Sequence, residues 1–473
     1  MATSPDRPSP RPAEPAEDGR ADPIWVGDTI AAIATAAGTA GIGIVRLSGP
    51  DVPTIARSLL GRPPRPRHAH YLRIHDGMGH VLDDGLLLLF PGPASYTGED
   101  TLELQTHGNP HLLNAVLRRC LELGARPARP GEFTERAFLN GKLDLAQAEA
   151  VADLIAAGSD AAARAARRSL DGLFSERIAD LADRLTDLRV YVEAAIDFPE
   201  EEIDVLAGPE LGSRLADVRN RLHRLLAEAE RGVRLRDGLH VVIIGEPNAG
   251  KSSLLNRLAG GDRAIVTDIP GTTRDTVRET VRIDGIELTL VDTAGLRTTD
   301  DVIESEGIRR ARAEMARADL LLAVTDAREG QAGRQRLAID LPSHVEVLWI
   351  ANKSDLLPPD SGSTEPEPES ASGPLPLSTR TGQGLDRLRD ALRRAAGLDG
   401  NPEGAFTARN RHLDALRRVE AHLSLAEQRL AEGAGELAAE DLHSAHDALG
   451  EITGRTSPDA LLGEIFGRFC IGK

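Results

Sequence analysis

Residues 240–252 constrain the fold of this 473-residue chain more than any other stretch. An apolar run, His-Val-Val-Ile-Ile, leads into a segment with the spacing G-x-x-x-x-G-K-S, which starts at Gly245 and ends at Ser252. The pattern predicts a buried strand, a glycine-rich loop and the first turn of a helix. Such a loop surrounds phosphates with backbone N–H groups. We expect Lys251 to reach the β- and γ-phosphates, the Ser252 hydroxyl to ligate Mg²⁺, and the helix dipole to favour the anion.

The sequence around this loop alternates between strand-like and helix-like segments from residue 239 to residue 399. Four apolar runs are candidates for buried strands, at residues 240–244, 288–291, 320–324 and 345–351. This alternation predicts a parallel α/β sheet. Residues 358–376 are rich in Pro, Ser and Glu, which predicts a disordered surface loop inside this region.

Two motifs follow predicted strands, and the second of them points to guanine as the base. Asp292 begins Asp-Thr-Ala-Gly, in which its carboxylate is expected to hold the Mg²⁺ shell and the Gly295 amide to meet the γ-phosphate. The Asn-Lys-Ser-Asp motif ends at Asp355, whose carboxylate can accept both the N1 and the N2 hydrogens of guanine, which adenine does not offer. We expect Asn352 to contact the base and Lys353 to lie over its ring.

A Gly-Thr-Thr loop between these elements is expected to supply the second Mg²⁺ ligand through the Thr273 hydroxyl. The Ser-Thr-Arg motif at 378–380 is expected to complete the base pocket through backbone contacts. The predicted GTP-binding set is therefore Asn248, Ala249, Gly250, Lys251, Ser252, Ser253, Thr267, Asp268, Ile269, Pro270, Gly271, Thr272, Thr273, Asp292, Thr293, Ala294, Gly295, Asn352, Lys353, Ser354, Asp355, Ser378, Thr379 and Arg380.

The group that would position the attacking water is not obvious from the nucleotide motifs. Many signalling GTPases carry Gln directly after the third motif, where this chain has Leu296. Because a leucine cannot orient water, hydrolysis needs another polar group, and Arg297 and Glu304 lie nearby in the sequence. The acidic residues of 300–306 are equally compatible with a solvated surface.

Outside the α/β region the sequence shows two further patterns of residues. Residues 24–141 mix strand-like runs with Gly/Pro turns and one helix-like stretch, which predicts an α+β domain. Residues on both sides of the α/β region are helical, so we expect that region to be inserted into a helical domain. The expected domains are a disordered tail (1–23), an N-terminal α+β domain (24–142), a first helical part (143–237), the α/β domain (238–399) and a second helical part (400–473).

Composition limits the possible partners. The formal net charge of −18 and the aromatic content of 3% argue against a surface that grips nucleic acid along its whole length, so such contact would be local or shared with a partner. Only two cysteines occur, Cys120 and Cys470, which excludes a disulfide framework and fits a reducing cytoplasm. No apolar run is long enough to span a membrane, and the N-terminus lacks the apolar centre of a signal peptide.

The chain resembles the MnmE (TrmE) family of tRNA-modification GTPases over residues 27–473. Besides the nucleotide motifs, short family motifs occur in both outer regions and in the family's order. They lie at residues 28–34, 41–46, 96–100, 130–140 and 469–473. The resemblance implies an N-terminal domain that dimerises and binds a formylated or methylene tetrahydrofolate, a helical domain, and a Ras-like P-loop GTPase domain inserted in the helical domain.

The resemblance also implies roles for individual residues. A 5-formyl- or 5,10-methylene-tetrahydrofolate would be bound by Arg46, Glu103, Lys142 and Lys473, and Glu304 would position the attacking water. Potassium would be bound by the Asn248 side chain and by loop oxygens of Thr267, Ile269 and Thr272. A monovalent cation beside the phosphates can supply the charge that an arginine finger supplies in other GTPases. In the family, potassium and pairing of two GTPase domains across the homodimer stimulate hydrolysis.

The implied reaction involves an FAD-dependent partner of the MnmG (GidA) type, with which the homodimer could form a heterotetramer. It adds a carboxymethylaminomethyl or aminomethyl group at C5 of the wobble uridine of certain tRNAs, and GTP hydrolysis drives a conformational step. The alternative is a GTP switch that regulates assembly and performs no covalent chemistry. Ala36, Ala37 and Thr39 replace the family's usual residues beside the folate site, and Thr379 replaces an alanine. For Cys470 we expect a buried, unreactive thiol.

Overall fold

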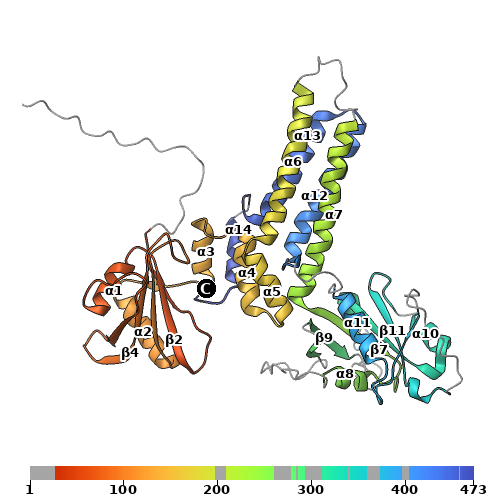
Figure 1. Cartoon of the computed structure of the whole chain (residues 1–473), viewed down its shortest axis with the longest axis horizontal. Helices are drawn as coiled ribbons and strands as arrows, with labels where there is room; N and C mark the ends of the chain where they lie inside the picture. Colours follow the sequence, from red (N-terminus) through yellow and green to blue (C-terminus); the bar gives the residue numbers. More distant parts are fainter. Residues whose placement is uncertain are drawn as a thin grey trace, which may run out of the picture. The chain divides into compact units, whose positions relative to one another are not determined.

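A computed structural model describes residues 27–197, 209–259, 278–283, 286–292, 312–338, 341–358, 373–396, 404–456 and 459–472. The chain divides into two compact units, one made of Met1–Lys142 with Phe466–Lys473, and one made of Leu143–Ile465 (Figure 1). In the part of the chain that is described, no helix combines the length and the apolar character needed to cross a membrane.

The N-terminal unit is the predicted α+β domain. Its sheet has the strand order β3-β4-β5-β2-β1-β6, and all neighbours are antiparallel except β1 and β6. The elements are β1 (Ile30–Ile33), β2 (Ala40–Ser48), α1 (Val52–Leu60), β3 (His70–His75), β4 (Val81–Phe90), β5 (Thr101–Gly108), α2 (Pro110–Glu122), β6 (Arg126–Pro127) and α3 (Glu132–Leu139).

One face of this sheet forms the core with α1 and α2. Strand β3 alternates strictly between buried and exposed residues, as expected for a sheet with one solvated face. Its buried apolar side chains, Leu72 and Ile74, join Val45, Leu104, Ile55 and Val116 in one apolar cluster. Gly43 lets α2 approach β2, because a Cβ atom there would lie 2.5 Å from a methyl carbon of Leu113.

The end of the chain belongs to this N-terminal unit, which differs from the predicted helical part at 400–473. Pro130 and Ile471 form an antiparallel bridge, and the N–H of Gly131 donates to the Cys470 carbonyl at 3.4 Å. These long-range backbone contacts leave no periodic signal in the sequence. Cys470 is exposed, so the expectation of a buried thiol was wrong.

The second unit contains the helical domain. Its helices are α4 (Leu145–Ala156), α5 (Asp160–Leu170), α6 (Leu173–Asp197), α7 (Pro209–Asp237), α12 (Asn410–Ala431), α13 (Gly435–Thr453) and α14 (Asp459–Gly467). Helices α6, α7, α12 and α13 lie side by side in Figure 1 and share one apolar core. Because α7 and α12 come from opposite sides of the α/β region, the predicted insertion is confirmed.

The inserted α/β region has a mainly parallel sheet with the strand order β12-β11-β10-β7-β9-β8, in which only β8 runs antiparallel to its neighbour. All four predicted strands are present. The elements are β7 (Leu239–Gly245), α8 (Lys251–Ala259), β8 (Arg278–Ile283), β9 (Ile286–Asp292), β10 (Leu320–Asp326), the 3₁₀ helix η2 (Ala327–Glu329), α10 (Gly330–Ala338), β11 (Glu346–Asn352), the 3₁₀ helix η3 (Ser354–Leu356), β12 (Leu375–Pro376) and α11 (Leu385–Ala395).

The predicted loop at 358–376 lies mostly outside the described residues. Its last two residues, Leu375 and Pro376, form β12 and pair in parallel with Ile350 and Ala351 of β11. The sequence therefore placed the end of this loop slightly too late. The expected tail at 1–23 also lies outside the described residues.

Two buried acids of α4 hold both connections of the α/β region. Glu149 is only 1% exposed and pairs with Arg411 at 2.7 Å and with His412 at 2.9 Å. Asp153 pairs with Arg236, near the end of α7, at 2.8 Å and with Arg409, just before α12, at 2.7 Å. Burial alone would raise the pKa of Glu149, but its cationic partners outweigh burial and hold that pKa well below its ordinary value.

Removing the Glu149 carboxylate is expected to destabilise the helical domain strongly. Glu149→Ala leaves Arg411 and His412 without their carboxylate, and breaking a buried pair in this way costs about 3–5 kcal/mol. Denaturant unfolding monitored by circular dichroism measures the change. The control is Glu427→Gln, which removes an exposed pair with Arg219 and is expected to cost less than about 1 kcal/mol. Equal small losses in both variants would contradict the structural role of Glu149.

Candidate nucleotide site

The phosphate loop has the expected strand–loop–helix context, between Gly245 at the end of β7 and Lys251 at the start of α8. Both flanking glycines are required by close neighbours. A Cβ atom at Gly245 would collide with the Val324 carbonyl of β10, and one at Gly250, where φ is +98°, would collide with the side-chain amide of Asn352. The two glycines therefore permit contacts that a larger residue would prevent.

The side chain of Lys251 lies inside this loop. It is 6% exposed, and its Nζ donates to the carbonyls of Gly245 at 2.9 Å and Glu246 at 3.0 Å. Ser252 is the next residue, in the first turn of α8, where backbone N–H groups and the helix dipole favour anions. The Lys251 ammonium thus lies within a loop that suits phosphates, and Ser252 follows it in the sequence.

Asn352 connects three parts of the site. It is 1% exposed at the end of β11. Its Nδ2 donates to the Ala249 carbonyl at 2.8 Å, and its Oδ1 accepts from the Thr379 N–H at 3.1 Å. Both ends of its amide bind backbone, and the expected contact with the base stays a prediction. Its contacts fasten the phosphate loop to the 378–380 segment.

Asp355 is prepared to act as a hydrogen-bond acceptor. Its Oδ1 accepts from the Ser378 hydroxyl at 2.7 Å, and its Oδ2 pairs with Arg380 at 2.8 Å. The Ser378 hydrogen bond and the Arg380 charge hold the pKa of Asp355 below its ordinary value, so the carboxylate is ionised at neutral pH. An ionised carboxylate only accepts hydrogen bonds, as the reading of the guanine N1 and N2 hydrogens requires.

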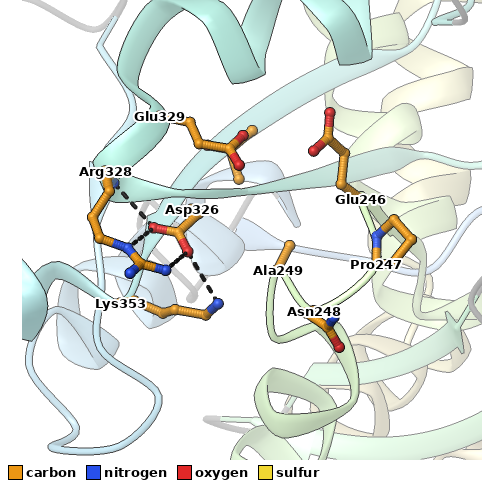
Figure 2. Close-up of a pocket in the computed structure, with 9 residues that line it drawn as sticks. Glu246, Pro247, Asn248, Ala249, Asp326, Arg328, Glu329 and Lys353 are labelled. Atoms are coloured by element: carbon orange, nitrogen blue, oxygen red, sulfur yellow. Dashed lines mark hydrogen bonds and ion pairs between the residues drawn. The ribbon is translucent and has the colours of Figure 1, made fainter.

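A pocket of about 210 Å³ opens between the phosphate loop and Lys353 (Figure 2). The Lys353 Nζ lies 3.0 Å from Oδ2 of Asp326, the last residue of β10. Hydrogen bonds from Arg328, reinforced by Lys353, hold the pKa of Asp326 well below its ordinary value. Asp326 is not among the residues predicted from the sequence. Its position two residues after the predicted buried strand at 320–324 was the available signal.

Several predicted residues lie outside the described part of the chain. They are Thr267, Asp268, Ile269, Pro270, Gly271, Thr272, Thr273, Thr293, Ala294, Gly295, Glu304 and Lys473. Asp292 is the last residue of β9, and its backbone pairs with Ile243 of β7 in parallel register. This register places Asp292 on the strand next to the one that carries the phosphate loop.

The oxygen ligands that this site offers fit a Mg²⁺ ion that is bound together with a nucleotide. Magnesium in such sites keeps most of its ligands from phosphates and water and takes one or two from the protein. Ser252 provides one such hydroxyl beside Lys251. Among the described residues, no group of three His, Cys, Asp or Glu side chains is arranged to hold a metal without a nucleotide.

In the N-terminal unit, Arg46 and Glu103 are brought together as cross-strand neighbours on β2 and β5. The Arg46 guanidinium donates to Glu103 Oε1 at 2.9 and 3.1 Å and lies 5.8 Å from the ring centre of Tyr96. The Nζ of Lys142 donates to the Pro93 carbonyl at 3.1 Å, in the loop that also carries Tyr96. Arg46 and Lys142 thus both contact this one loop, and Glu103 binds Arg46.

The 130–140 motif proves to hold that loop in place. Arg136 is only 3% exposed and pairs with Glu99 at 3.0 Å and with Asp28 at 2.6 Å. The Tyr96 hydroxyl lies 2.8 Å from the Thr134 hydroxyl. These contacts could not be predicted from the motifs, because the pairs join residues far apart in the chain.

The fold and the site together define a P-loop GTPase. Residues 29–142 match the model of the GTP-binding protein TrmE N-terminus, and residues 145–470 match that of the MnmE helical domain. The chain is 57% identical over 452 residues to the tRNA modification GTPase MnmE of Xanthomonas campestris pv. campestris, covering 94% of this chain and 99% of the relative. The chain therefore belongs to the MnmE family of tRNA modification GTPases.

Other relatives agree with this assignment. The MnmE of Xylella fastidiosa is 56% identical over 452 residues, which cover 95% of this chain and 98% of the relative. A solved structure of Era from Aquifex aeolicus is 25% identical and covers 39% of this chain and 66% of its own, with a TM-score of 0.27. That score is too low to support an argument.

Asp355→Asn is expected to weaken GTP binding and to relax the preference for guanine. Hydrogen bonds to charged groups contribute ~1.5–3 kcal/mol, so we expect a loss of roughly 10- to 100-fold in affinity. Binding of GTP and of xanthosine triphosphate measures the change. The control is Asp386→Asn on α11, where the side chain is 97% exposed. An unchanged preference between the two nucleotides would count against the role of Asp355.

Proposed function

We propose that this GTPase works with an FAD-dependent partner of the MnmG (GidA) type to modify certain tRNAs. Together they would add a carboxymethylaminomethyl or aminomethyl group at C5 of the wobble uridine, with a one-carbon tetrahydrofolate as donor. The observation that carries the proposal is the similarity to MnmE relatives, which covers 94% of the chain and extends far beyond the nucleotide site. The reaction would take place in the cytoplasm.

The charges of the N-terminal unit support a folate site. A folate combines a pterin ring, which has N–H donors, with glutamate carboxylates. Glu103 could accept from such donors, while Arg46, Lys142 and Lys473 could bind carboxylates. The Tyr96 ring beside Arg46 adds an apolar surface. A bound folate would supply the one-carbon unit, and this chain's residues would bind and orient it.

The phosphate loop supports a potassium site. Asn248 has a left-handed backbone with φ of +63°, is exposed, and lines the pocket beside the loop (Figure 2). Potassium would bind its side-chain oxygen together with loop oxygens of Thr267, Ile269 and Thr272. Mg²⁺ would bind Ser252 and Thr273. The extra positive charge would stabilise the transferring phosphoryl group.

Hydrolysis would drive a conformational step. Glu304 would position the attacking water, and two such chains would pair their nucleotide-binding regions in a homodimer. Within one chain, both connections of the α/β region are held by acids of α4. A conformational change at the nucleotide site would therefore be transmitted to the helical domain by these ion pairs.

Reconstitution tests the proposed reaction and separates it from a GTP switch. The chain is incubated with an MnmG-type partner, unmodified tRNA, GTP and methylene-tetrahydrofolate, and tRNA nucleosides are analysed by mass spectrometry. We expect a modified uridine, and at least about tenfold less of it with Arg46→Met, because a charged hydrogen bond contributes ~1.5–3 kcal/mol. GTP turnover should stay unchanged in that variant.

The matched control for this experiment is Arg73→Met. Arg73 lies on β3 of the same sheet and makes an exposed pair with Asp84. It should leave both modification and turnover unchanged. Turnover of GTP with no modified uridine under any condition would favour the GTP switch.

Potassium is expected to stimulate GTP turnover relative to sodium at matched ionic strength. A stimulation of at least about tenfold corresponds to a barrier change of only ~1.4 kcal/mol, which one added charge near the phosphates can provide. Steady-state phosphate release measures it, and Asn248→Ala should remove most of the difference between the two salts. Equal rates in both salts would leave a GTPase without the proposed cation site.

A further inference from the structure

Asp326 lies at the centre of the nucleotide-site edge of the sheet, although none of the nucleotide motifs includes it. It ends β10, whose residues are all buried, and its backbone pairs in register with Asn352 of β11. Asp326 itself is 8% exposed. The sheet register therefore places an acidic side chain directly beside the strand end that continues into Lys353 and Asp355.

The carboxylate of Asp326 is fixed by Arg328. The Arg328 Nε donates to Oδ1 at 2.9 Å, a terminal nitrogen donates to Oδ2 at 2.7 Å, and the Arg328 backbone N–H donates to Oδ1 at 3.1 Å (Figure 2). A bidentate pair with an additional backbone bond leaves the carboxylate little freedom to rotate. Oδ2 is thereby held in a fixed position toward Lys353.

The fixed Oδ2 atom of Asp326 holds the ammonium group of Lys353 in place. Its Nζ donates to Oδ2 at 3.0 Å, and its backbone is left-handed, with φ of +63°. A free lysine side chain would lose much rotamer entropy when a ligand packs on it. A lysine whose ammonium is already held loses less, so tethering prepares its methylene groups for contact with a flat ring.

We propose that Asp326 is a positioning residue for the guanine nucleotide, which holds Lys353 in place to cover the base. Arg328 in turn holds Asp326. The proposal rests on the nucleotide site proposed above and adds one residue to it. Since Lys353 would contact the nucleoside and not the γ-phosphate, the effect is the same for GTP and GDP, and hydrolysis of bound GTP does not depend on it.

The test begins with Asp326→Asn, which keeps the shape of the side chain and removes its charge. We expect affinity for GDP and for GTP to fall about tenfold, with kcat at saturating GTP unchanged. Titration with a fluorescent GDP analogue and steady-state turnover give the two quantities. The matched control is Asp386→Asn on α11, the same change at a side chain that is 97% exposed. It should bind GDP like the unaltered chain.

A double-mutant cycle shows whether Asp326 acts through Lys353. Lys353→Met keeps an apolar stem and removes the ammonium. If Asp326 acts through that ammonium, Asp326→Asn should cost little further affinity in the Lys353→Met background. Losses that simply add would overturn the proposal, as would unchanged GDP affinity in a folded Asp326→Asn variant.

Two further outcomes keep the test decisive. If Asp326→Asn does not fold, as judged by its thermal midpoint, Asp326→Glu is used, which keeps the charge but displaces it by one methylene. It should bind GDP about threefold more weakly, and full affinity in that variant would overturn the proposal. If the unaltered chain bound no guanine nucleotide, the nucleotide site itself would fail, which is distinguishable from a failure confined to Asp326.

Discussion

The parallel pairing of β10 with β7 and β11 determines where each part of the nucleotide site lies. Val324 pairs with Gly245, and Asp326 pairs with Asn352. Parallel strands end at the same edge of a sheet, and ligands bind in the crevice outside those ends. Since every residue of β10 is buried, packing on both faces fixes this register, and with it the spacing between the phosphate loop and the base-binding segment.

The glycines of the phosphate loop are required by the close approach of neighbouring protein atoms, and not only by the binding of phosphates. The position that a Cβ of Gly250 would occupy is taken by the Asn352 amide, which joins Ala249 to Thr379. The second glycine of the loop therefore permits an internal connection in addition to any contact with a ligand. A rigid loop binds phosphates with less loss of entropy, so this connection is part of the binding function.

The sequence predicted the strands and the nucleotide motifs because both depend on local patterns. Buried parallel strands appear as short apolar runs, and the loop and base motifs have fixed spacing. What it missed depends on pairs of distant residues. Arg136 with Asp28, and Pro130 with Ile471, give no periodic signal. Asp326 was missed for a different reason, because a single acid after an apolar run is too common to interpret until the register places it beside Lys353.

The ion pairs of α4 and those of the nucleotide site share one physical property, which is directionality. An apolar contact tolerates sliding, whereas Asp153 can hold Arg236 and Arg409 together only in one arrangement of the two connections. Displacing either connection would break one of the two ion pairs of the buried Asp153. The junction therefore favours the one arrangement that the structure shows over gradual bending.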